Sequence, residues 1–197
     1  MFVKVCGMSV IGMESYPVSV EVDISAGLPQ FSTVGLPDIS VKESRDRIKA
    51  AIKNSGYAFP RNHVTINLAP ADIKKEGTGF DLPIAVGILA AEELISVESL
   101  RDSFFIGELS LDGSIKSVRG VLPAAFKAKE LGIKRVFVPE ENAAEAAMVE
   151  GLAVFPLNTL PDVVDFLSNR KIMEPLALDV SKIFQEHRRY EFDFNEI

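Results

Sequence analysis

Apolar positions recur first with the period of strands and then with the period of helices. Runs rich in Val and Ile predict strands at residues 2–11, 18–24 and 31–34, and residues 63–68 alternate between apolar and polar side chains. Turns at residues 12–17 and 27–29 separate the first three runs. The first third of the chain is therefore expected to be mainly β.

Two helices interrupt this pattern. Asp38 is a good capping residue for a helix that runs to about Ser55, with Gly56 just past its end. Residues 81–91 are apolar on nearly every side, which is typical of a helix buried in the centre of a domain. We therefore expect this second helix to be enclosed by the rest of the fold.

The second half mixes shorter strands and helices. We expect strands at 104–109, 135–138 and 152–155, a hairpin turn at 112–113, and helices at 118–131, 142–150 and 161–167. The rhythm is not a regular βαβ alternation, so the pattern predicts an α+β fold with mixed sheets and packed helices. From Asn169 the pattern weakens, and a mixed-charge run covers 181–197. We expect one domain at 1–168 and a linker or docking tail at 169–197.

Composition narrows the choice of partners. The chain has 197 residues, 47% hydrophobic residues and a net charge of −7, which is ordinary for a soluble globular protein and repels polyanions at long range. Cys6 is the only cysteine, no leader peptide is visible, and the longest apolar run is too short to span a bilayer. A cytoplasmic location without membrane contact is expected.

One basic stripe departs from this acidic balance. Lys42, Arg45, Lys49 and Lys53 are spaced 3, 4 and 4 apart, so they share one helical face. This face either follows phosphates in DNA or is a solvated surface that Glu43 and Asp46 partly neutralise. Lys74 and Lys75 would extend the stripe only if the fold brings them near it. No aromatic residue is interleaved with these cations in the sequence, so stacking of single strands is not expected.

Several ordered blocks resemble the amino-terminal domain of the ComM (YifB) family of magnesium-chelatase-related AAA+ proteins. The blocks are Gly-Leu-Pro at 27–29, Val-Gly-Leu-Pro-Asp at 34–38, Val-Lys-Glu-Ser at 41–44, Asn-Ser-Gly at 54–56, Asn-Leu-Ala-Pro-Ala-Asp at 67–72 and Lys-Glu-Gly-Thr-Gly-Phe-Asp-Leu-Pro at 75–83. The segments 107–113 and 132–139 are more faintly similar to the second half of the Lon protease domain. The resemblance implies a Lon-protease-like fold of the ribosomal-protein-type βα superfamily, shared with the Lon-like domain of RadA.

The same resemblance implies that proteolysis is lost. Lon proteases use a Ser–Lys dyad, which needs a hydroxyl and an amine of lowered pKa within hydrogen-bond reach. By resemblance the serine position falls on Gly79, and an ungapped count puts the lysine position at Leu122. A peptidase with an unconventional nucleophile, such as Thr78 with Lys127, stays open as the alternative but needs a shifted register.

Other chemistry has little sequence support. The chain lacks a P-loop, and its two histidines and one cysteine do not form a metal motif. The loop from Gly77 to Gly79 is either a weak anion site or a tight turn before the buried helix. A magnesium-chelatase accessory subunit is the last alternative.

The family resemblance also implies a larger context. In that family this domain precedes an AAA+ module, which would bind ATP and Mg²⁺ and form hexamers, and residues 192–197 are similar to the segment just before it. The family drives DNA branch migration in recombination and natural transformation. We therefore expect a non-catalytic domain whose partners are its own AAA+ module, further copies of the chain and, as a further candidate, DNA.

Overall fold

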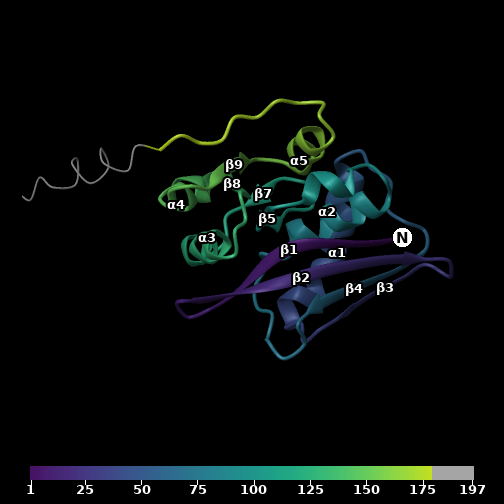
Figure 1. Ribbon diagram of the computed structural model, residues 1–197. Helices are drawn as coiled ribbons and strands as arrows, with labels where there is room; N and C mark the ends of the chain where they lie inside the picture. Colours follow the sequence, from purple (N-terminus) through teal and green to yellow (C-terminus); the bar gives the residue numbers. More distant parts are fainter. Residues whose placement is uncertain (179–197) are drawn as a thin grey trace, which may run out of the picture.

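A mixed seven-stranded sheet with helices on both faces forms the body of the molecule (Figure 1). The computed structural model describes residues 1–178, so most of the linker or docking tail predicted at 169–197, including its mixed-charge run at 181–197, lies outside the described residues. The strand order is β3-β4-β2-β1-β5-β8-β9. Within the described residues, none of the helices is both long and apolar enough to cross a membrane.

The two halves of the sheet are built differently. In the first half β1 pairs antiparallel with β2, β2 pairs antiparallel with β4, and β3 lies parallel to β4 at the edge. In the second half the strands run parallel from β1 to β5, β8 and β9. The bounds are β1 (Phe2–Ile11), β2 (Glu14–Ser25), β3 (Gln30–Val34), β4 (His63–Ala69), β5 (Ser103–Phe105), β8 (Arg135–Pro139) and β9 (Ala153–Leu157).

The helices divide between two hydrophobic clusters. Neighbouring strand residues enter different clusters, as Phe104 and Phe105 do, because successive side chains of a strand point to opposite faces. Figure 1 shows α3 and α4 close together at one end of the molecule. The first cluster includes side chains of α1 (Ile39–Asn54), α2 (Asp81–Ala91) and α5 (Leu160–Leu167). The second includes side chains of α3 (Val121–Glu130) and α4 (Ala143–Ala147).

The central helix α2 is enclosed, as its pattern predicts. All eleven of its residues are buried, including the one carboxylate, Asp81. A Cβ atom added at Gly87 would lie 2.6 Å from Val22 Cγ2, so the missing side chain lets α2 approach β2 closely. The sheet covers one side of α2, and α1, α5 and β6 (Glu108–Leu109) contact it as well, so the helix is buried on every side.

Four predicted elements differ from the structure. The turn predicted at 12–17 is confined to residues 12–13, because β2 begins at Glu14 and pairs with β1 from there. The predicted strand at 104–109 divides into β5 and β6, because Gly107 instead donates its N–H to the Gly79 carbonyl and accepts from the Leu82 amide at the start of α2. The strand β6 pairs with β7 (Ile115–Lys116) in a small separate sheet. The predicted helix at 118–131 begins only at Val121, since Gly120 caps it with a φ of 82°. The predicted helix at 142–150 is a 3₁₀ turn, Glu140–Asn142, followed by the short α4.

Candidate functional site

The two positions expected from a Lon-type dyad do not share a site. Gly79 lines a cleft of about 980 Å³ between the loop before α2 and the segment that leads into α3. Leu122 lines a different groove, beside Met13 and Phe126, and packs against the second hydrophobic cluster. In the folded chain, therefore, the two dyad positions open onto separate surfaces.

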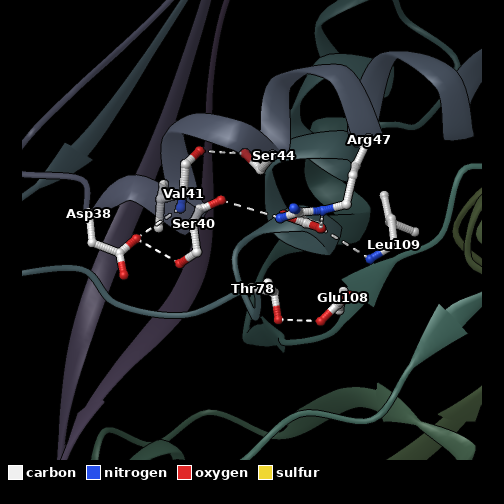
Figure 2. Close-up of polar contacts among 9 residues, drawn as sticks. Asp38, Ser40, Val41, Ser44, Arg47, Thr78, Glu108 and Leu109 are labelled. Atoms are coloured by element: carbon white, nitrogen blue, oxygen red, sulfur yellow. Dashed lines mark hydrogen bonds and ion pairs between the residues drawn. The ribbon is translucent and has the colours of Figure 1, made fainter.

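The cleft also lacks a substitute dyad. The hydroxyl of Thr78 donates a hydrogen bond to the carboxylate of Glu108 (Figure 2). No lysine or histidine is among the residues that line this cleft, and Lys127 lines the other groove, beside Leu122. A Cβ atom at Gly79 would lie 3.1 Å from Ile106 Cγ1, so even the serine position is crowded. The geometry therefore does not support a Ser–Lys type of mechanism.

An ion pair lies behind the cleft. Arg47 of α1 donates from Nε to Asp81 Oδ2 at 2.9 Å and from Nη2 to Oδ1 at 3.2 Å (Figure 2). The amide of Leu109 donates to the same carboxylate at 3.2 Å. Burial raises the pKa of Asp81 to about 6, against the lowering effect of Arg47. This pair joins α1, α2 and β6, and its carboxylate is closed off from solvent.

The cleft has the wrong charge for an anion. Its lining carries four carboxylates and a single cation, Arg119. The amide of Gly77 donates to Asp38 Oδ2 at 3.3 Å, and the amide of Leu82 donates to the Gly107 carbonyl at 3.1 Å. The loop from Gly77 to Gly79 is therefore better described as a turn into α2 than as an anion site. The four carboxylates are those of Asp38, Glu76, Glu108 and Glu141.

The predicted basic stripe is exposed on α1. The opposite side of this helix packs into the core through Val41, Ile48 and Ile52, so the polar side faces solvent. The exposed cations are Lys42, Arg45, Lys49 and Lys53.

The two further lysines differ in exposure. Lys75 is fully buried and its ammonium group donates to the Pro70 carbonyl, so its predicted place on a DNA-binding surface is wrong. Burial lowers the pKa of this amine. Lys74 is exposed but forms an ion pair with Glu76. Of the two, only Lys74 is exposed to solvent.

Sequence reasoning missed an aromatic wall beside these cations. A groove of about 620 Å³ runs along α1 and is lined by three stripe cations together with Phe31, Tyr57 and Phe59. Phe31 comes from β3, and the two other rings come from the segment between α1 and β4. Only the fold brings these segments together, so the spacing of the cations in the sequence does not reveal the rings beside them. The three stripe cations in the groove are Arg45, Lys49 and Lys53.

The described residues do not assemble a metal centre. Within residues 1–178, no group of three or more His, Cys, Asp or Glu side chains is arranged to hold a metal ion. His63 lies at the start of β4 and is half-buried. The cation-bearing groove and the acidic cleft are thus the two surfaces with distinctive chemistry.

Comparisons with known proteins place the chain in a family. Residues 20–142 match the family model described as subunit ChlI of Mg-chelatase. The chain is 44% identical over 87% of its length to YifB of Salmonella typhimurium and 40% identical over 87% of its length to the competence protein ComM of Haemophilus influenzae. It covers 34% and 33% of these two proteins, so it spans about a third of their length.

A more distant relationship reaches the Lon proteases. Lon protease 2 of Bacillus subtilis is 26% identical over 89% of this chain and 35% of that protein. Since this identity is well below that to YifB and ComM, it indicates a Lon-like relationship at a greater distance. The chain belongs to the Mg-chelatase-related family that includes YifB and ComM.

Proposed function

We propose that this chain is a non-catalytic domain of a larger ATP-driven protein and that it contacts DNA through the exposed cations of α1. The observation that carries the proposal is the separation of charge between the two surfaces. Among the residues that the structure describes, the cleft that contains Gly79 is lined by four carboxylates and no lysine, whereas the groove along α1 has no carboxylate in its lining. A polyanion is attracted to the second surface and repelled by the first.

The family context supports a role in DNA handling. One relative is named a competence protein, and the chain matches about a third of that relative. In this proposal the remaining two thirds include an AAA+ module that binds ATP and Mg²⁺, assembles as a hexamer in the cytoplasm and drives branch migration. The present domain then holds DNA near the motor.

Salt-dependent DNA binding tests this proposal. Fluorescence anisotropy of a labelled duplex should show log affinity falling with log salt at a slope of about −3.6, because each phosphate contact contributes about −0.9 and four cations are available. Reversing all four charges, in a variant with Lys42→Glu, Arg45→Glu, Lys49→Glu and Lys53→Glu, should abolish binding at ~50 mM salt.

A matched variant distinguishes the effect of the stripe on DNA binding from the effect of net charge alone. It reverses three exposed lysines and one exposed arginine elsewhere, in Lys116→Glu, Lys129→Glu, Lys134→Glu and Arg101→Glu. Both variants carry the same net charge, so only a specific contact makes them differ. Equal loss of affinity in the two variants, or no binding by the unaltered chain, would contradict the proposal.

The non-catalytic part of the proposal has its own test. A fluorophosphonate probe, which labels activated serine and threonine hydroxyls, should leave the chain unmodified. Labelling that disappears in Thr78→Val would show an unconventional nucleophile in the cleft and would overturn this part.

A further inference from the structure

The groove along α1 offers positive charge that is largely unpaired within residues 1–178. Its twelve lining residues in this part of the chain include four cations, Arg45, Lys49, Lys53 and Arg61, and no Asp or Glu. Among the ion pairs formed within residues 1–178, none involves Lys49, Lys53 or Arg61. Within the same residues, Arg45 forms an ion pair with the exposed Asp46, at 3.7 Å. A concave surface of this kind concentrates positive potential on a chain whose net charge is −7.

The same groove has a wall of aromatic rings. The rings of Phe31 and Phe59 stack with centroids 6.3 Å apart and planes inclined by 30°. Lys49 Nζ lies 6.0 Å from the centroid of Phe59, at the outer limit of a cation–π contact. Phe31, Tyr57 and Phe59 are all half-buried, so the core fixes them while part of each ring faces the groove.

Cations beside fixed rings favour one class of polyanion. Single-stranded nucleic acid presents phosphates that follow a positive groove and bases whose faces stack on aromatic side chains. The bases of a duplex already stack on one another inside the helix, so recessed rings cannot reach their faces. A groove of about 620 Å³ is also within the size range of pockets that enclose small ligands, which suits a base with its sugar rather than a duplex.

We propose that this groove binds single-stranded nucleic acid, with the cations of α1 and Arg61 on the phosphates and with Phe59, Tyr57 or Phe31 against the bases. Gln30 and Asn62 are exposed on its lining and supply amide groups for hydrogen bonds to base edges. This inference rests on the proposed function, since the same α1 cations make the phosphate contacts. It specifies single strands as the preferred form of the nucleic acid and names the groove residues that select them.

Binding of matched oligonucleotides by the full 197-residue chain tests the inference. The probes are labelled dT12, rU12, an abasic strand of the same length and a 12-base-pair duplex, each measured by anisotropy at ~50 mM salt. We expect dT12 to bind more tightly than the abasic strand and the duplex. Comparison of dT12 with rU12 then shows whether DNA or RNA is the better ligand.

A matched pair of variants locates the stacking, and a third variant serves as a fallback. Phe59→Leu keeps an apolar side chain but removes the ring, and it should weaken dT12 binding at least about fivefold, the lower end of the cost of losing one stacked base. Its affinity for the abasic strand should not change. Phe126→Leu removes an exposed ring of α3 outside the groove and should have no effect. Phe31→Leu repeats the test if circular dichroism shows that Phe59→Leu is unfolded.

The outcomes separate this inference from the proposed function. Equal affinity for dT12 and the abasic strand, or equal effects of Phe59→Leu and Phe126→Leu, would overturn the stacking site while leaving phosphate contact by α1 intact. Competition by poly-glutamate as strong as that by unlabelled dT12 would also overturn it, because the groove would then select charge alone. Absence of binding to every probe would overturn both proposals.

Discussion

At the residue scale, the most unusual side chain is the buried carboxylate of Asp81. Its side chain is inaccessible to solvent and meets Arg47, whose side chain is 23% exposed. A buried ion pair often costs as much in desolvation as it returns in attraction. The pKa of Asp81, raised by burial to about 6, indicates that desolvation is the larger effect here.

This shift predicts a pH-dependent contribution to stability. The pKa of Asp81 is about 6 in the folded chain and 3.8 as its ordinary value, so between these pH values the folded state binds the proton more tightly. Its contribution to the free energy of unfolding therefore falls as pH rises through this window. Asp81→Asn cannot ionise, so relative to the unaltered chain it should gain up to about 3 kcal/mol between pH 4 and pH 7.5.

Urea unfolding at the two pH values measures this difference. Asp46→Asn, which removes an exposed carboxylate from the helix that carries Arg47, controls for the general effect of lost charge. The contrary result is a difference in the free energy of unfolding between Asp81→Asn and the unaltered chain that is constant with pH or decreases as pH rises. That result would mean that Arg47 holds Asp81 ionised in the folded chain.

A glycine in the turn after β3 makes a second residue-scale prediction. Gly35 has a φ of 96°, and a Cβ atom there would lie 2.2 Å from the Leu68 carbonyl oxygen. Gly56 also has a positive φ, of 86°, but no atom lies within 4 Å of its Cβ position. Gly56→Ala should cost about 1–2 kcal/mol of stability from the backbone alone. Gly35→Ala should cost about 2 kcal/mol more because of the collision.

Thermal or urea unfolding of both variants checks this pair. An equal loss of stability at the two positions would contradict the prediction, because their backbone strain is similar and only Gly35 is crowded.

At the element scale, α1 joins the core to the proposed binding surface. Asp38 caps its first turn by accepting from the Val41 amide at 2.8 Å, and the same carboxylate accepts from the Gly77 amide at 3.3 Å. Figure 2 shows this cap beside Ser40 at the start of the helix. The cap thus ties α1 to the loop before α2.

Removing the cap should therefore loosen both segments. Asp38→Ala should lower the free energy of unfolding by about 1–2 kcal/mol, as expected for a lost N-cap. Asp38→Asn keeps an acceptor oxygen and should recover most of the loss. If urea unfolding finds the two variants equally unstable, the carboxylate charge rather than the cap hydrogen bond is what matters.

The same helix shows what its pattern can and cannot predict. Periodicity correctly places the cap at Asp38, the buried face and the exposed cations, because all three depend on local spacing. It wrongly includes Lys75, since the path of the loop that buries this residue is set by tertiary contacts. It also misses Phe31, because β3 reaches the groove only by pairing with β4.

Strand and helix boundaries show the same limit. The strand expected at 104–109 is interrupted because Gly107 bonds Gly79 and Leu82, which are distant in sequence. The dyad positions Gly79 and Leu122 follow from resemblance, but only the fold shows that they open onto different surfaces. The identity and local spacing of these residues could thus be predicted from the sequence, but their positions relative to one another in the fold could not.

At the scale of the whole molecule, the distribution of charge matters more than its sum. The net charge of −7 argues against a nucleic-acid ligand, yet the lining of the α1 groove contains no carboxylate. The acidic cleft near Gly79 and this groove involve different surfaces of the same domain. An acidic chain can therefore still present one surface suited to phosphates.

NMR shift changes locate the bound ligand on the chain. In a titration of the ¹⁵N-labelled chain with dT12, we expect amide shift changes in α1, at residues 29–31 and at 57–62, the segments that line the groove. Residues 76–80 and 117–120, which line the acidic cleft, should not shift. Shifts concentrated in the cleft, with the α1 groove unchanged, would contradict the central claim.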